Sequence, residues 1–198
     1  MTYIEIVGQD EEFTRQQRWS HILTLVTGLG LFLFGLNLRS GALNATSTYN
    51  DIQAGISATY PQNWLIDFDG DYVFRVHDVT GIGFGATIQI ALKPIGQNTT
   101  ERNILDTLNI TRPQTVTGYV PLSVEPYTLD ESEAVALNYT FVDKDYNPFL
   151  ESIPTVVRGQ DIIILRGGQA IIVTFLAASQ QFDDDIAIFE RFLDSLEL

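Results

Sequence analysis

The 198-residue sequence contains no cysteine and only two histidines, His21 and His77. The absence of cysteine excludes disulfides, thiolate metal sites, cysteine nucleophiles and a lipidated cysteine behind a signal sequence. A Ser-His-Asp triad would have to use His77, because His21 lies in an apolar segment, and no nucleophile motif accompanies it. We therefore expect a protein that is not an enzyme and that has no cofactor.

Positive charge is scarce as well. The chain carries 11 Lys and Arg against 25 Asp and Glu, a net charge of −14 at pH 7, and the basic residues form no run. A polyanion is a poor partner for nucleic acid and for anionic lipid headgroups. Hydrophobic residues make up 45% of the chain, which is enough for a folded core, and the length suits one domain plus an appendage.

Charge is missing altogether from residues 19–38, the stretch between Arg18 and Arg39. A helix of that length is about 30 Å long, which matches the hydrocarbon core of a bilayer. The two arginines can reach the headgroups, and Trp19 suits the membrane interface. We predict a single transmembrane helix over 19–38. The alternatives are a buried helix of a soluble protein and a cleaved signal peptide, whose apolar core would be shorter.

The basic residues around this helix predict its orientation. Arg15 and Arg18 precede it, whereas Arg39 stands alone after it and the next basic residue is Arg75. Because cytoplasmic flanks carry the excess of Lys and Arg, we expect residues 1–18 to form a cytoplasmic tail. The chain after the helix is then extracytoplasmic, at the cell membrane.

One face of the predicted helix consists of small residues. Ser20, Thr24, Gly28 and Gly35 recur at spacings of four, four and seven, which places them on one side of the helix. Helices in lipid associate by close packing at such residues. The predicted partners are therefore the lipid bilayer and the transmembrane helices of other subunits in a membrane complex.

Residues 39–54 are small and polar and are predicted as a linker, and residues 55–198 as one extracytoplasmic domain. Within this domain, alternating apolar and polar residues predict half-buried strands. Gly167-Gly168 predicts a hairpin turn, because paired glycines allow positive φ, and the apolar run after it predicts a central strand. The predicted strands are 55–60, 64–68, 71–77, 86–92, 119–124, 133–142, 156–165 and 169–177.

Two helices are predicted beside these strands. The first covers residues 99–108, with its apolar side chains on one face. The second begins at about Phe182, where apolar residues follow the 3–4 spacing of a buried face behind acidic first turns, with Ser179 as the candidate N-cap. Helices packed against one antiparallel sheet make an α+β domain.

The segment Tyr60-Pro61-Gln62-Asn63-Trp64 resembles the opening of the PsbP-like superfamily, whose members begin with a strand that ends in Tyr-Pro-x-x-Trp. The resemblance spans about residues 55–197. It implies an antiparallel sheet with a helix in an early connection, a closing hairpin and a C-terminal helix. It also implies a non-catalytic role, since the best known members are extrinsic subunits of photosystem II. We expect Trp64 to be a core residue, because an indole at a strand junction normally packs against neighbours.

The expected function is that of a non-catalytic, single-pass accessory subunit. Such a subunit would stabilise or assemble a larger membrane complex, photosynthetic or respiratory, through its helix and its outer domain. The alternative is an independent membrane-anchored ligand-binding or receptor module.

An acidic turn offers a candidate metal site. Asp67, Asp69 and Asp71 take alternate positions around Gly70, as the oxygen ligands of calcium loops do. Residues 143–147 repeat this spacing, but no glutamate closes either loop at the twelfth position. We therefore prefer a solvated turn between strands and expect no metal, with calcium at the three aspartates as the alternative.

Overall fold

The computed structural model describes residues 14–198 apart from 44, 53, 82, 130–131 and 145–153. The chain divides into two compact units, Met1–Ala45 and Thr46–Leu198.

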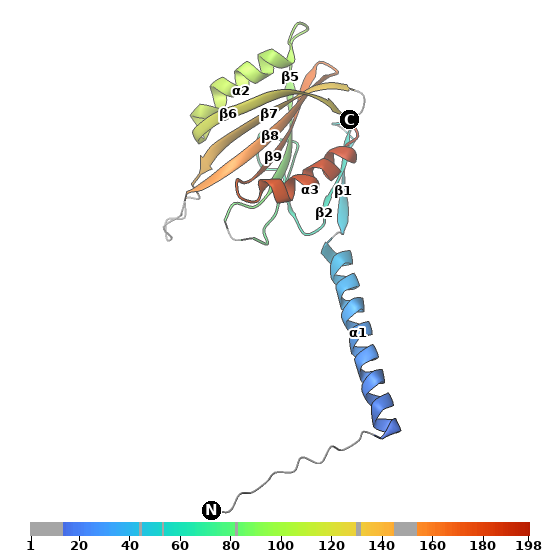
Figure 1. The fold of residues 1–198 in the computed structure, drawn as a ribbon. Helices are drawn as coiled ribbons and strands as arrows, with labels where there is room; N and C mark the ends of the chain where they lie inside the picture. Colours follow the sequence, from blue (N-terminus) through green and yellow to red (C-terminus); the bar gives the residue numbers. More distant parts are fainter. Residues whose placement is uncertain (1–13, 44, 53, 82, 130–131, 145–153) are drawn as a thin grey trace, which may run out of the picture. The chain divides into compact units, whose positions relative to one another are not determined.

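The described part of the first unit is dominated by the helix α1, Arg15–Leu43 (Figure 1). Every side chain of this helix from residue 15 to 41 is exposed, including those of Trp19, Leu23 and Phe32. By length and composition, α1 is the one helix among the described residues that could cross a membrane. The predicted helix over 19–38 is therefore present, and it continues beyond both predicted ends.

The second unit is built on an antiparallel sheet. Seven strands of the described chain pair in the order β3-β4-β5-β9-β8-β7-β6, and β1 and β2 form a separate antiparallel pair. The strands are β1 Thr46–Asp51, β2 Ile56–Pro61, β3 Leu65–Asp67, β4 Phe74–His77, β5 Thr87–Pro94, β6 Thr117–Leu129, β7 Ser132–Asp143, β8 Thr155–Arg166 and β9 Gln169–Ala178.

The helices α2, Glu101–Thr115, and α3, Phe182–Asp194, cover opposite faces of this sheet (Figure 1). Successive side chains of a strand point to opposite faces. Accordingly, Ile163 packs in the core cluster that includes α2 residues, whereas Ile162 and Ile164 pack in the cluster that includes α3 residues. The unit is an α+β domain, as the sequence predicts, and the structure shows one core on each face of its sheet.

The apolar strand after the paired glycines is β9, which lies fourth among the seven strands. Gly167 and Gly168 connect β8 to β9 with φ values of 60° and 77°, the left-handed conformation that a tight hairpin requires. Both the hairpin and the central strand are confirmed. Trp64 is 7% exposed and belongs to the core cluster on the α3 face, so this prediction is confirmed as well.

The predicted linker over 39–54 is wrong. Helix α1 continues to Leu43, and β1 begins at Thr46 and pairs with β2 along its whole length. The segment is polar, but its alternate residues, among them Ser47 and Tyr49, are half-buried in the pattern of a one-sided strand. Tyr49 packs against Phe74 with the ring centroids 4.5 Å apart, which is why a polar segment is ordered here.

Two helix boundaries also differ from the prediction. Helix α2 runs to Thr115 and contains Pro113 in its last turn, where the missing N–H removes one intrahelical hydrogen bond without ending the helix at that residue. The N-cap of α3 is Gln181 and not Ser179, and it makes no side-chain capping hydrogen bond. Three aspartates in the first turn of α3 supply the negative charge that the helix dipole favours.

Candidate functional site

The acidic turn after β3 is organised by its own hydrogen bonds. The Asp69 N–H donates to Asp67 Oδ1 at 2.9 Å, and the Tyr72 hydroxyl donates to Asp67 Oδ2 at 2.7 Å. The bond from Asp69 and then the bond from Tyr72 lower the pKa of Asp67. Asp71 faces a different surface, described below. Among the described residues, no group of three or more His, Asp or Glu side chains is arranged to hold a metal ion. Asp145 and Asn147 of the second acidic segment lie outside the described residues.

The small-residue face lies on α1. Ser20, Thr24, Gly28 and Gly35 are all exposed, and the Thr24 hydroxyl donates to the Ser20 carbonyl oxygen at 2.9 Å. At about 100° per residue, the four positions fall within an arc of roughly 80°. A Cβ added at Gly28 or Gly35 would meet no atom within 4 Å. The chain itself therefore leaves this face open.

A buried charge lies on the α2 face of the sheet. Asp161 of β8 is completely buried, and its Oδ2 forms an ion pair with Arg112 Nη2 from the last turn of α2. Oδ1 accepts hydrogen bonds from the Thr174 hydroxyl at 2.8 Å and from the Tyr139 hydroxyl at 3.2 Å. All three partners are donors, which is the environment of an ionised carboxylate.

Strand register explains how these side chains meet. Gln89 of β5 pairs with Thr174 of β9, which pairs in turn with Asp161 of β8. Because residues opposite one another on neighbouring strands share a face, the three polar side chains form a row across the centre of the sheet. The row lies on the face of the sheet that α2 covers. The Arg112 side chain therefore extends from α2 toward the row and contacts Asp161.

An aromatic pair supports the arginine. The Arg112 guanidinium carbon lies 4.0 Å from the ring centroid of Tyr139, a cation–π contact, and the Tyr119 ring centroid is 5.4 Å from that of Tyr139. The Tyr119 hydroxyl donates to Asn109 Oδ1 at 2.8 Å, one helical turn before Arg112. The Nη1 atom of Arg112 is buried and has no hydrogen-bond partner among the described residues.

The sheet makes room for this stack at Gly159. Gly159 of β8 is the cross-strand partner of Tyr139, and a Cβ added there would collide with the Tyr139 ring. Only glycine therefore allows the ring to lie flat against β8 beneath the guanidinium.

Burial is the largest single influence on the pKa of Asp161, Arg112 and Tyr139. It raises the pKa of the Asp161 carboxyl, although the Arg112 charge and the hydrogen bonds from Thr174 and Tyr139 oppose the shift. Burial alone would lower the pKa of Arg112. The attraction to Asp161 and the other interactions that favour the charged form together outweigh burial, so the pKa is raised. Burial also raises the pKa of Tyr139 well above its usual value. Arg112 is therefore charged at all physiological pH values.

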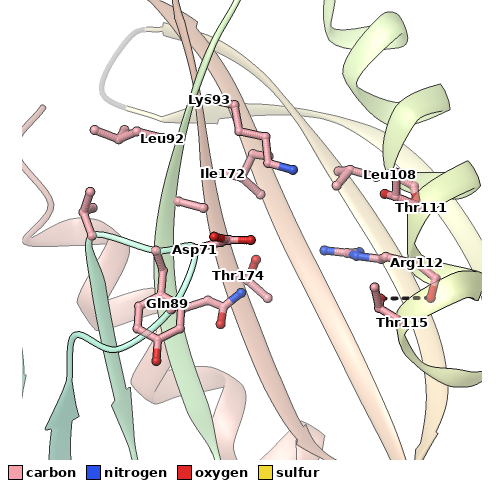
Figure 2. A pocket seen from close by; sticks show the side chains of 14 residues that line it. Asp71, Gln89, Leu92, Lys93, Leu108, Thr111, Arg112, Thr115, Ile172 and Thr174 are labelled. Atoms are coloured by element: carbon pink, nitrogen blue, oxygen red, sulfur yellow. Dashed lines mark hydrogen bonds between the residues drawn. The ribbon is translucent and has the colours of Figure 1, made fainter.

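An open pocket of about 750 Å³ adjoins this cluster. Figure 2 shows it between α2, β5 and β9, with the segment around Asp71 on the opposite side. Its charged lining residues are Asp71, Lys93 and Arg112, and its remaining walls mix polar and apolar side chains.

Sequence reasoning selects Asp71 but misses Asp161, Arg112 and the pocket. A signal for Asp161 exists, because it is the one charged residue between Arg158 and Arg166 in a strongly apolar strand. A carboxylate among buried strand residues needs a cationic partner. Nothing in the sequence indicates that the partner is Arg112.

Solved structures identify the fold of the second unit. The cyanobacterial PsbP (CyanoP) from Synechocystis sp. PCC 6803 superposes with a TM-score of 0.57 at 14% sequence identity, covering 78% of this chain and 92% of CyanoP. The domain has a PsbP-like fold. This confirms the fold that the Tyr60–Trp64 segment implies.

Other proteins share the PsbP-like fold with similarly low identity. LpqN, involved in cell envelope biogenesis of Mycobacterium tuberculosis, has a TM-score of 0.51 at 11% identity, covering 78% of this chain and 91% of LpqN. The Saccharomyces cerevisiae Ran-binding protein Mog1p has a TM-score of 0.50 at 7% identity, covering 77% of this chain and 95% of Mog1p. No protein-family model matches the sequence, and no curated protein matches it. At these identities the likeness extends to the fold alone.

Proposed function

We propose that the chain is a non-catalytic, single-pass accessory subunit of a larger membrane complex, anchored by α1 and presenting its PsbP-like domain outside the cytoplasm. The observation that carries this proposal is the exposure of α1. Its apolar side chains are exposed all round the helix within the described residues. A helix that is apolar all round requires an apolar environment, which a bilayer and neighbouring helices provide.

The flanking charges support the proposed orientation. Arg15 and Arg18 lie at the start of α1, and Arg39 lies alone near its end. An excess of basic residues marks the cytoplasmic side, so residues before α1 are cytoplasmic and the PsbP-like domain is extracytoplasmic. The resemblance to extrinsic photosystem II subunits favours a photosynthetic or respiratory complex.

The contact with the complex is proposed to lie on the small-residue face of α1. Small residues let helix backbones approach closely, which is the main route to helix association in lipid. Substitution of Gly28 by leucine would insert a side chain at the closest approach, while the added apolar atoms favour membrane insertion. The two effects are therefore separable: Gly28→Leu remains in the membrane and loses its partners.

Gly30 supplies a matched control. It lies two residues further along α1, about 200° around the helix from Gly28, and a Cβ there also meets no atom within 4 Å. We expect Gly28→Leu to abolish copurification of the partner subunits after mild detergent extraction and Gly30→Leu to preserve it. Equal copurification of both variants would refute the proposed contact face.

The pocket beside Arg112 favours a second candidate function, an independent membrane-anchored ligand-binding or receptor module. A pocket of about 750 Å³ is within the size range of small-molecule sites. The two candidates differ in the state of the extracted protein. An accessory subunit copurifies with other membrane proteins, whereas an independent module is extracted alone.

A further inference from the structure

The pocket beside Arg112 carries both signs of charge on its walls. Lys93 and Arg112 are cationic, Asp71 is anionic, and the buried Asp161 compensates Arg112 from behind. These four charges sum to zero. We propose that this pocket binds a small zwitterion of the amino-acid type that carries an apolar side chain. The inference does not depend on the accessory-subunit proposal.

The charges lie where the two ends of a zwitterion could meet them. Figure 2 shows the Asp71 carboxylate and the Arg112 guanidinium pointing toward one another from opposite walls, with the Lys93 amine at the upper side of the same space. A ligand carboxylate facing Lys93 and Arg112 leaves its ammonium group to face Asp71. A simple anion would be repelled by Asp71, and a simple cation by the two basic residues.

Arg112 is held in place before any ligand arrives. Its side chain is only 15% exposed and is fixed by the ion pair with Asp161 and by the Tyr139 ring. Replacing a buried ion pair by apolar side chains is often neutral or stabilising, so stability alone gives little reason for this pair. Arg112 Nη1 is buried and has no hydrogen-bond partner among the described residues, so the guanidinium has donor capacity that the ion pair with Asp161 does not use.

The remaining walls suit the rest of such a ligand. Gln89, Thr111 and Thr174 supply uncharged polar groups, and Thr174 already donates to Asp161, so its hydroxyl oxygen is left as an acceptor. The apolar lining includes Leu108 and Ile172, which are buried. An apolar wall with a few convergent polar groups is typical of small-molecule sites and matches an aliphatic or aromatic side chain.

Three probes that share the leucine side chain but carry different end-group charges test the proposal. Leucine carries both charges, N-acetyl-leucine lacks the ammonium and leucinamide lacks the carboxylate. Binding is measured by isothermal titration calorimetry with the full chain in lipid nanodiscs. A hydrogen bond to a charged group is worth roughly tenfold or more in affinity, so we expect leucine to bind at least about tenfold more tightly than either analogue.

Two pocket variants test which side chain binds the carboxylate of the ligand and which binds its ammonium group. Lys93→Gln weakens binding of leucine and N-acetyl-leucine by about tenfold and leaves leucinamide unchanged or tighter. Asp71→Asn weakens leucine and leucinamide and leaves N-acetyl-leucine unchanged or tighter. Both side chains are exposed, so neither substitution disturbs the core. The controls Lys144→Gln and Asp106→Asn remove the same charges from exposed positions that do not line the pocket.

Each outcome of these binding experiments either supports or overturns the proposal. Preference for leucine together with the crossed pattern of the two variants supports the proposal. Tighter binding of N-acetyl-leucine than of leucine would make the pocket an anion site and overturn it. Absence of binding by leucine, methionine and phenylalanine at millimolar concentration, or equal effects of the pocket variants and their controls, would also overturn it.

Discussion

Removal of the Asp161 carboxylate should destabilise the PsbP-like domain severely. Asp161→Leu leaves the Arg112 guanidinium without its counter-charge in a site where the side chain is 15% exposed. It also removes the acceptor of the Thr174 and Tyr139 hydroxyls. Breaking a buried pair by removing one partner costs about 3–5 kcal/mol. At a typical urea m-value of about 2 kcal/mol per M, the unfolding midpoint should fall by about 2 M.

A double variant distinguishes two causes of this loss of stability: a buried arginine charge without a counter-charge, and a simple packing defect. Asp161→Leu combined with Arg112→Met replaces both charges by apolar side chains of similar length, a change that is often close to neutral. We therefore expect the double variant to be more stable than Asp161→Leu alone. The measurement is urea unfolding of the full chain in mild detergent, followed by circular dichroism at a wavelength dominated by the sheet.

The single variant Arg112→Met adds a pH signature. In the native protein, burial raises the pKa of Asp161 and the Arg112 charge opposes this shift. Without Arg112 the native pKa rises further above the unfolded value. A group with a raised native pKa stabilises the fold at low pH and loses that contribution as pH rises through the native pKa. The loss of unfolding free energy caused by Arg112→Met should therefore become smaller as the pH falls toward about 4.

One outcome would refute this interpretation of the buried cluster. It is a loss under about 1 kcal/mol of unfolding free energy for Asp161→Leu, with no recovery of stability in the double variant.

Three further predictions follow from the fold. Gly159→Ala should cost about 1–3 kcal/mol of unfolding free energy, since its Cβ collides with the Tyr139 ring, whereas Gly96→Ala, in ordinary contact only, should cost little. Trp64→Ala should cost about 3–5 kcal/mol, because the indole is 7% exposed, and a loss below about 1 kcal/mol would show that it does not support the core. Protease added to intact cells should digest the PsbP-like domain. A domain that stays intact would show that the proposed orientation is wrong.

Local patterns were enough to predict the centre of the domain. The apolar run after Gly167-Gly168 is so strongly apolar that it had to be buried on both faces, and β9 is the central strand. The 3–4 spacing from Phe182 similarly predicts α3, whose buried residues include Phe189 and Leu193. In these elements local propensity and tertiary packing agree.

Elements with weak local signals were predicted poorly. The polar segment of β1 is ordered by distant partners, among them the Tyr49 ring contact with Phe74, which no local pattern contains. Helix α2 continues past the point where its apolar spacing ends, because Arg112 in its last turn and Asn109 one turn earlier hold it over the sheet. The pocket assembles Asp71, Gln89 and Arg112 from a turn, a strand and a helix, which only the tertiary fold brings together.

The native composition of the extracted protein tests the accessory-subunit proposal most directly. The full chain is extracted from its own membranes in a mild detergent, and the protein mass and the identity of the subunits in the particle are measured. We expect a particle much larger than the 22.1-kDa chain, containing other membrane proteins whose association is lost in Gly28→Leu and kept in Gly30→Leu. Extraction as a lone 22.1-kDa chain, or as an assembly of this chain alone, in several detergents would contradict the accessory-subunit proposal.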